Sequence, residues 1–188
     1  MSQTSHLKAT ALTNLDASPI LEPNTGAGGA TLNRSADGYA VPLANDATTS
    51  TYQLVRIPST AIVKQVKFGS QAQAAGKFNL GLYFSTSLKD GTAASNQNSD
   101  GTPKVAAASA DSFFATDVDC ASAVQAANYT NGNGTTTSYT FDLMQEPIWK
   151  ALGLSTDPGG FFDVCATCHT TAVTTGTGKI YCEVVWTP

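Results

Sequence analysis

Charged residues are scarce in this 188-residue chain: Asp, Glu, Lys and Arg together make up only 13% of it. This is about half the share found in ordinary globular proteins. With a net charge of −4, the chain has no excess of basic residues to attract a phosphate backbone, so we expect no direct binding of nucleic acid. Thr, Ser, Ala, Asn and Gly take the place of the missing charges, a composition typical of strands joined by small-residue loops.

Long apolar runs are also missing. No segment reaches the roughly 18 to 20 apolar residues of a membrane span, so we expect no membrane partner. The first eight residues, Met1 to Lys8, lack the apolar core of a secretory signal, which predicts a chain made and kept in a cytoplasm. In that compartment the four cysteines are expected to be thiols.

Motifs of catalysis are absent as well. The two histidines are His6 and His169, far apart in the sequence. The chain contains no nucleophile elbow, Walker loop or dinucleotide fingerprint, and no acidic residue ends an apolar strand as in a glycosidase. We therefore expect a protein that is not an enzyme and carries no cofactor.

What the sequence does contain is apolar alternation of period two. In residues 61–68 every second side chain from Ile62 to Phe68 falls on one face, and in residues 77–84 the same holds from Phe78 to Phe84. Such alternation is typical of half-buried strands. We expect these two strands to be adjacent and antiparallel.

Weaker signals fill in the remaining elements. We expect strands at 52–57 and 137–143, a helical turn at 110–116, a short helix at 146–152, and a closing hairpin formed by 161–173 and 179–186. Several short strands with few helices predict an all-β fold, an antiparallel β-sandwich of jelly-roll type, with an edge-protected barrel as the alternative.

The first 50 residues differ from the rest because they show no amphipathic period. We expect them to form an extended N-terminal arm (1–50) in front of a β-sandwich domain (51–188). Their scattered apolar residues exceed what a solvated linker needs, so we expect the arm to become ordered against a partner. The candidate partner-binding residues are Leu12, Leu15, Ile20, Leu21, Tyr39 and Val41.

The sharpest chemical motif is Cys165-Ala-Thr-Cys168-His169, which matches the pattern for covalent haem attachment. Haem attachment requires both cysteines on one side of a helical turn. Here the motif lies in a Thr- and Val-rich segment that predicts a strand, where residues three apart point to opposite faces. We therefore do not expect haem.

Zinc is a second possibility, with Cys165, Cys168, His169 and Cys182 as a complete ligand set. The opposite faces of the strand disfavour it, although a bulge could turn one side chain around. In the expected closing hairpin, Cys168 and Cys182 are diagonal neighbours, too far apart for a disulfide. We expect Cys168 and Cys182, with Cys120, to be small core residues and Cys165 to be at least partly exposed.

Several segments, taken in order, resemble the head decoration or cement proteins of tailed bacteriophages. The resemblance spans about residues 50–188, and it is carried by 54–63, 66–69, 78–83, 113–119, 147–158 and 183–186. It implies a β-sandwich on the surface of the virion that clamps neighbouring subunits of the major capsid protein, often as a homotrimer. Where such proteins have aliphatic residues in the last hairpin, this chain has Cys168 and Cys182, which favours core positions for both.

Two other functions remain open. A tail, fibre, or receptor- or glycan-binding β module would expose an aromatic patch, for which Tyr129 and Tyr139 are the candidates. A redox or metal enzyme would use the group Cys165, Cys168 and His169, and its purified form would contain metal or haem.

Overall fold

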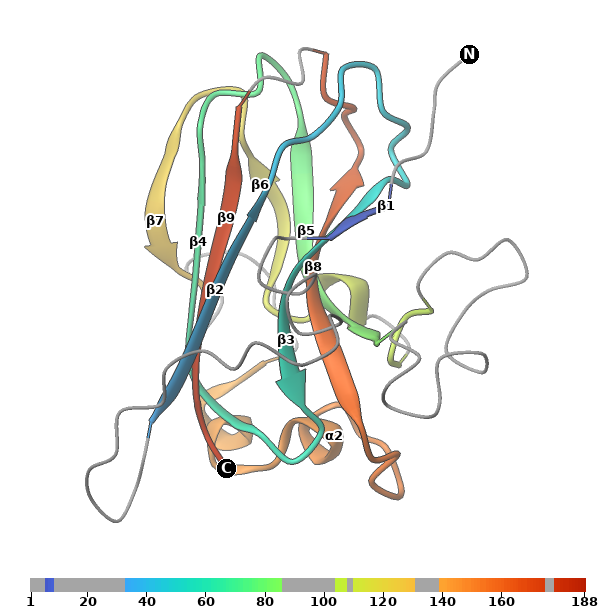
Figure 1. The fold of residues 1–188 in the computed structure, drawn as a ribbon, viewed down its shortest axis with the longest axis vertical. Helices are drawn as coiled ribbons and strands as arrows, with labels where there is room; N and C mark the ends of the chain where they lie inside the picture. Colours follow the sequence, from blue (N-terminus) through green and yellow to red (C-terminus); the bar gives the residue numbers. More distant parts are fainter. Residues whose placement is uncertain (1–5, 9–32, 86–103, 108–109, 131–138, 175–177) are drawn as a thin grey trace, which may run out of the picture.

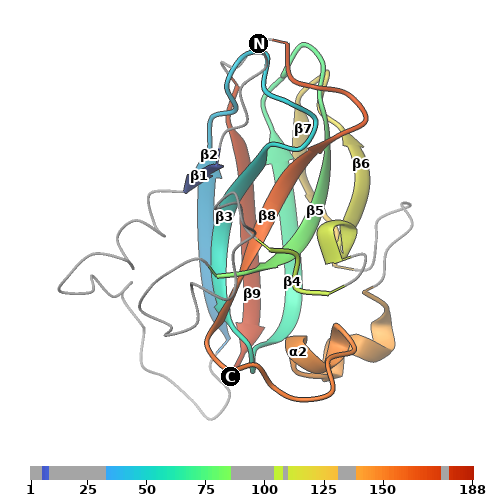
Figure 2. The same cartoon turned by 90° about the vertical axis from the view of Figure 1, so that its right-hand side faces the viewer.

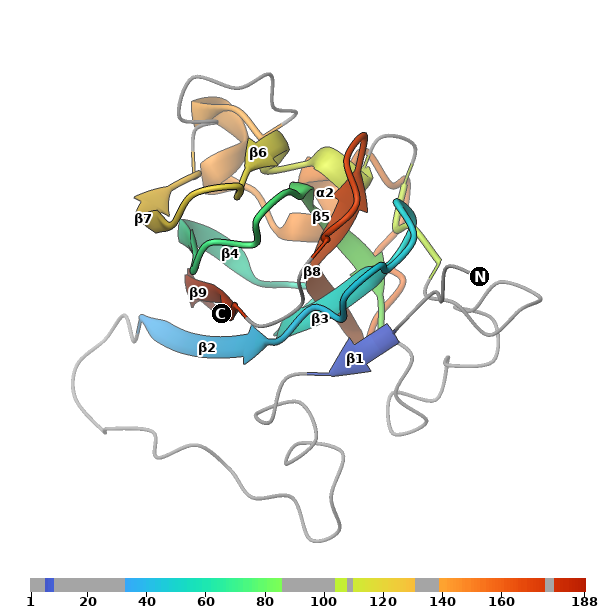
Figure 3. The ribbon, with the colours of Figure 1, turned by 90° about the horizontal axis from the view of Figure 1, so that it is seen from above.

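The computed structural model describes residues 6–8, 33–85, 104–107, 110–130, 139–174 and 178–188 of the chain. These residues form two β-sheets that pack face to face (Figures 1 and 3). The strands are β1 (His6–Lys8), β2 (Arg34–Ala40), β3 (Thr51–Pro58), β4 (Ile62–Ser70), β5 (Lys77–Phe84), β6 (Ala115–Asp119), β7 (Val124–Asn128), β8 (Phe161–His169) and β9 (Ile180–Thr187). The helical elements are the 3-10 turns η3 (Ala110–Ser112) and η4 (Phe141–Gln145) and the helix α2 (Ile148–Ala151).

One sheet has the strand order β1-β3-β8-β5-β6 and the other has the order β2-β9-β4-β7. The pairing is nested along the chain: β2 pairs with β9, β3 with β8, β4 with β7 and β5 with β6, all antiparallel. Only β1 departs from this pattern among the described strands, because it lies parallel to β3. The all-β sandwich predicted from the sequence is therefore confirmed.

The core lies between the two sheets. Phe68 of β4 and Phe78 of β5 come from opposite sheets, and their ring centroids are 6.5 Å apart. The two strands expected at 61–68 and 77–84 both form. The prediction that they are neighbours in one sheet is wrong. Residues 71–76 carry the chain across the sandwich instead, and the two apolar faces meet through the core.

The expected alternation of β4 is interrupted by a bulge. Its register against β9 shifts between Val63 and Gln65, so Val63, Val66 and Phe68 are fully buried while Lys64 is only half-buried. An extra residue in one strand moves the following side chains to the other face. The sequence placed Lys64 on the core side because a strict period of two does not anticipate a bulge.

The last two strands do not form the predicted hairpin. β8 lies in the five-stranded sheet and β9 in the four-stranded sheet, so residues 170–179 connect the two layers. The strand expected at 137–143 is also wrong where the structure describes it, since Phe141–Gln145 forms the 3-10 turn η4. The helical turn expected at 110–116 is confirmed for Ala110–Ser112 alone, since β6 begins at Ala115. The short helix expected at 146–152 is confirmed as α2, which begins after Pro147.

The sandwich begins earlier than the boundary at residue 51 implies. β2 pairs with β9 over seven consecutive residues, from Arg34 opposite Trp186 to Ala40 opposite Ile180. The sequence allowed only a short strand at 37–43 within the arm, and it did not place Arg34–Ala36 in that strand, because Asp37 and Gly38 interrupt the apolar pattern. The domain therefore includes residues 34–50, which the sequence assigned to the arm.

Candidate functional site

The cysteine and histidine residues of the haem-like motif do not converge in space. Cys165 lies opposite Gly81 on the outer side of the five-stranded sheet, whereas Cys168 lies opposite Phe78 and points toward the core. Cys182 belongs to β9 in the other sheet. In the described part of the chain, no three His, Cys, Asp or Glu side chains are close enough to hold a metal ion.

All four cysteines are buried free thiols. Burial raises the pKa of Cys168 to about 11 and that of Cys120 to about 12, because a thiolate loses its hydration there. The core positions predicted for Cys120, Cys168 and Cys182 are confirmed. The predicted exposure of Cys165 is wrong: its thiol is fully buried, and burial together with the charge of Asp163 raises its pKa.

His169 forms a surface pair at the end of β8. Its Nδ1 lies 2.8 Å from Oδ1 of Asp117, and the Thr170 hydroxyl donates to the same oxygen at 2.9 Å. The hydrogen bond with His169 is the main cause that holds the pKa of Asp117 below its usual value. Asp117 and Thr170 both have positive φ angles, 50° and 41°, which residues other than glycine rarely adopt.

Cys165 is buried because the outer face of the five-stranded sheet is itself covered. η3 packs on Gly81 so closely that a Cβ atom there would lie 2.2 Å from the carbonyl oxygen of Ala110. On the same face, Arg56 donates two hydrogen bonds, of 2.7 and 3.0 Å, to the carboxylate of Asp163, and both side chains are buried. This face thus holds a second, polar core, and little of it is available to a partner.

The outer face of the four-stranded sheet is more open. Along β9 buried and half-buried residues alternate from Ile180 to Val185, as in a sheet with one solvated face. On β2, Tyr39 is 45% exposed, and the Lys179 ammonium lies 4.6 Å from its ring centroid. Of the predicted arm residues, Tyr39 belongs to this face and Val41 is half-buried just after β2. Leu12, Leu15, Ile20 and Leu21 lie outside the described residues.

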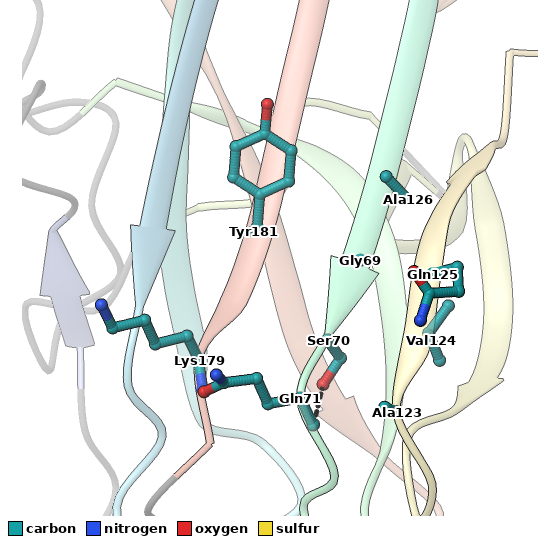
Figure 4. A pocket seen from close by; sticks show the side chains of 9 residues that line it. All are labelled: Gly69, Ser70, Gln71, Ala123, Val124, Gln125, Ala126, Lys179 and Tyr181. Carbon is teal, nitrogen blue, oxygen red and sulfur yellow. Dashed lines mark hydrogen bonds between the residues drawn. The ribbon is translucent and has the colours of Figure 1, made fainter.

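A shallow groove of about 330 Å³ crosses this open face between β9, β4 and β7 (Figure 4). Small residues form its floor, and Tyr181 stands at one side (Figure 4). Its lining consists of Gly69, Ser70, Gln71, Ala123, Val124, Gln125, Ala126, Lys179 and Tyr181. The groove is therefore a candidate for a small polar ligand with one apolar face.

The other candidate surface is the α2 end of the sandwich, formed by η4, α2 and residues 152–161 (Figures 1 and 2). Backbone hydrogen bonds attach it to the turn between β3 and β4: Trp149 N donates to Ser59 O at 3.3 Å and Ser59 N donates to Gly160 O at 3.0 Å. Phe141 is 70% exposed and Phe161 is 40% exposed here. Partly buried apolar side chains at the same end are Leu143, Met144, Trp149, Leu152 and Leu154.

Sequence reasoning missed this apolar end because a Phe in a predicted strand is expected to point inward. It also placed the aromatic patch on the wrong residues. Tyr139 is fully buried and donates its hydroxyl to Val63 O at 2.7 Å, and Tyr129 packs on Phe68 with ring centroids 6.3 Å apart. The exposed aromatic rings are instead those of Phe141, Phe161 and Tyr39.

Comparisons with protein-family models, with curated proteins and with solved structures gave no significant match. In the described residues, no helix is long and apolar enough to cross a membrane.

Proposed function

We propose that this chain is a non-catalytic structural protein of a bacteriophage virion. In this proposal it is made in the host cytoplasm, binds the outer surface of the capsid, and cements neighbouring subunits of the major capsid protein. The observation that carries the proposal is the apolar α2 end, where Phe141 is 70% and Phe161 is 40% exposed. Exposed apolar side chains gathered at one end are characteristic of protein–protein contact surfaces.

The fold is compatible with this role. The nested pairing from β2–β9 to β5–β6 is the arrangement of a jelly roll, a sandwich of two Greek keys, and we infer that type here. Viral capsid proteins and lectins both use jelly rolls, so the fold alone does not choose between functions. The choice rests on the α2 end and on the low charge, which limits the cost of removing water from a contact surface.

Binding to capsids tests the proposal. The particles are built from the major capsid protein of the phage that encodes this chain, and cryo-electron microscopy locates the added density. The double variant Phe141→Ser/Phe161→Ser should lose about tenfold or more in affinity, since exposed aromatic anchors of an interface carry much of its energy. Leu43→Ser is the matched control, because Leu43 is also exposed (41%) but lies in the connection from β2 to β3, at the opposite end. Full occupancy by the double variant, or density on the tail alone, would contradict the proposal.

The arm is a separate part of the proposal. Deleting residues 2–32 removes β1, which pairs only with the first three residues of β3. The deletion should abolish binding to particles while the rest of the sandwich stays folded, because β2 begins only at Arg34. A deletion as far as residue 45 would remove β2 and would not separate anchoring from folding. Unchanged occupancy of the particles after the shorter deletion would show that the arm is not an anchor.

A receptor- or glycan-binding module is the second candidate, and the groove on the four-stranded sheet favours it. A sugar ring could lie on Tyr181 and the small floor while Gln125 binds its hydroxyl groups. Screening of the purified chain against soluble oligosaccharides, with Tyr181→Ala as the negative control, tests this function. Binding that survives Tyr181→Ala, or no binding to any sugar, would exclude the groove as a glycan site.

A further inference from the structure

β2 is a regular edge strand that exposes one side of its backbone. It is the outermost strand of the four-stranded sheet, and no described strand pairs with its free side. Its register against β9 is unbroken from Arg34 to Ala40, and Arg34, Ser35, Asp37 and Tyr39 are exposed. An unpaired edge of this kind offers backbone donors and acceptors to another strand.

The other sheet edges are less suited to strand addition. β7 has five residues, and its register shifts between Phe68 and Ser70 of β4. β6 also has five residues and a shifted register, and Asp117 within it has a φ angle of 50°. β1 covers the first three residues of β3, and Pro58 ends that strand. Bulges, short strands, prolines and charged side chains are the usual protections of an edge. β2 contains neither a proline nor a bulge, and its two charges, on Arg34 and Asp37, have opposite signs.

We propose that two copies of this chain associate through β2, which pairs antiparallel with β2 of the second copy. The joined sheets then form one continuous eight-stranded sheet, and the unpaired backbone groups of both edges are satisfied. A two-fold axis perpendicular to the sheet keeps each side chain on its face. Residues directly opposite each other in the pair must have their side chains on the same face. The axis therefore has to lie between one residue of β2 and the same residue of the second copy.

Charge excludes one position of the axis. An axis through Asp37 would place the two Asp37 carboxylates directly opposite each other, which is unfavourable. An axis through Ala36 instead places Ser35 opposite Asp37 of the second copy, where the hydroxyl can donate to the carboxylate. Arg34 then lies opposite Gly38, which leaves room for its long side chain. The second copy thus fits the edge without a clash of like charges.

This geometry sets where the two α2 ends lie. Arg34, the first residue of β2, is opposite Trp186 near the end of β9, and Thr187 is opposite Ile62 beside the α2 end. In an antiparallel pair the two copies run in opposite directions, so their α2 ends lie at opposite ends of the joined sheet. If the proposed function holds, such a dimer reaches two capsid sites at once, which increases its avidity.

Light scattering on the purified full chain in solution, without capsids, tests the association. We expect a species of twice the 19.4 kDa chain mass that dissociates on dilution. Ser35→Asp places two carboxylates opposite each other at both symmetric pairs and should weaken the dimer about tenfold. Ser35→Lys should keep or strengthen it, because Lys then faces Asp37. Ser122→Asp makes the same change at an exposed position just before β7, at the opposite edge of the sheet, and should leave the dimer unchanged.

Proline scanning tests the edge independently of charge. Backbone N–H groups of a strand alternate in direction, so one of Ser35→Pro and Ala36→Pro removes an outward N–H and spares the pairing with β9. That variant should keep its far-UV circular dichroism but become monomeric. A monomer at every soluble concentration, a trimer, or an oligomer that withstands both Ser35→Asp and the folded proline variant would overturn the proposal. Because this assay contains no capsid, its failure would leave the proposed capsid binding unaffected.

Discussion

The buried ion pair between Arg56 and Asp163 allows the sharpest test of the fold. Nε of Arg56 lies 2.7 Å from Oδ1 and Nη2 lies 3.0 Å from Oδ2, and the two side chains are 4% and 0% exposed. Arg56→Met removes the cation and leaves the carboxylate buried, which typically costs about 3 to 5 kcal/mol. A domain of this size is stable by only about 5 to 15 kcal/mol, so the loss is a large part of the total.

Urea unfolding followed by circular dichroism measures this loss. With a slope of about 2 kcal/mol per molar urea, a cost of about 4 kcal/mol lowers the midpoint by about 2 M. The double variant Arg56→Met/Asp163→Leu removes both charges and should recover most of the stability, since an apolar pair of similar volume replaces a buried ion pair at little cost.

The half-buried pair of Lys67 and Glu183, 3.4 Å apart, supplies the matched control. Lys67→Ala should cost less than about 1 kcal/mol, because water screens an accessible pair. If Arg56→Met costs no more than Lys67→Ala, the outer face of the five-stranded sheet is not the second core described here.

Two further predictions concern the same buried regions. Gly81→Ala should destabilise the protein by about 3 kcal/mol in urea unfolding, because the new Cβ would lie 2.2 Å from the backbone oxygen of Ala110, whereas Gly159→Ala, in open space at a φ angle of 71°, should cost only about 1 kcal/mol. Equal losses for the two variants would refute close packing of η3. Burial raises the pKa of Cys168 from 9.0 to about 11, so its contribution to stability is complete below pH 9 and is lost as the pH rises through 11. Cys168 alone should therefore lower the free energy of unfolding in this window by up to about 1.4 kcal/mol per pH unit, so the slope should be shallower by that amount in Cys168→Ala; identical slopes for the two proteins would contradict the shift.

The strands that carry clear alternation were predictable from the sequence, but their partners were not. Residues 61–68 and 77–84 each have one apolar face in the sequence, and both segments form strands in the structure. Local periodicity tells that a face is buried, and it does not tell which sheet covers it. The prediction therefore joined β4 to β5, and β8 to β9, in hairpins, although each pair lies across the core. Sequence neighbours usually pair, and the crossings between sheets in this fold break that tendency.

The candidate sites were less predictable, because they depend on contacts between distant segments. The burial of Cys165 follows from η3 lying over Gly81, two elements that are far apart in the sequence. The exposure of Phe141 depends on η4 forming where alternation predicted a strand. The opposite faces of Cys165 and Cys168, by contrast, needed only the strand geometry and were correctly inferred.

The unequal burial of the two sheets explains why the proposed contacts fall where they do. The five-stranded sheet is packed on both faces, and it places the pair Arg56 and Asp163 inside, although charges are scarce in this chain. A partner must therefore use other surfaces, and the described residues offer the edge of β2, the outer face of the four-stranded sheet and the α2 end. Because residue 34 lies near the α2 end, antiparallel pairing at the edge moves the second α2 end to the far side of the joined sheet. The proposed dimer would thus present one α2 end at each end of the joined sheet, which makes it bivalent for capsid sites.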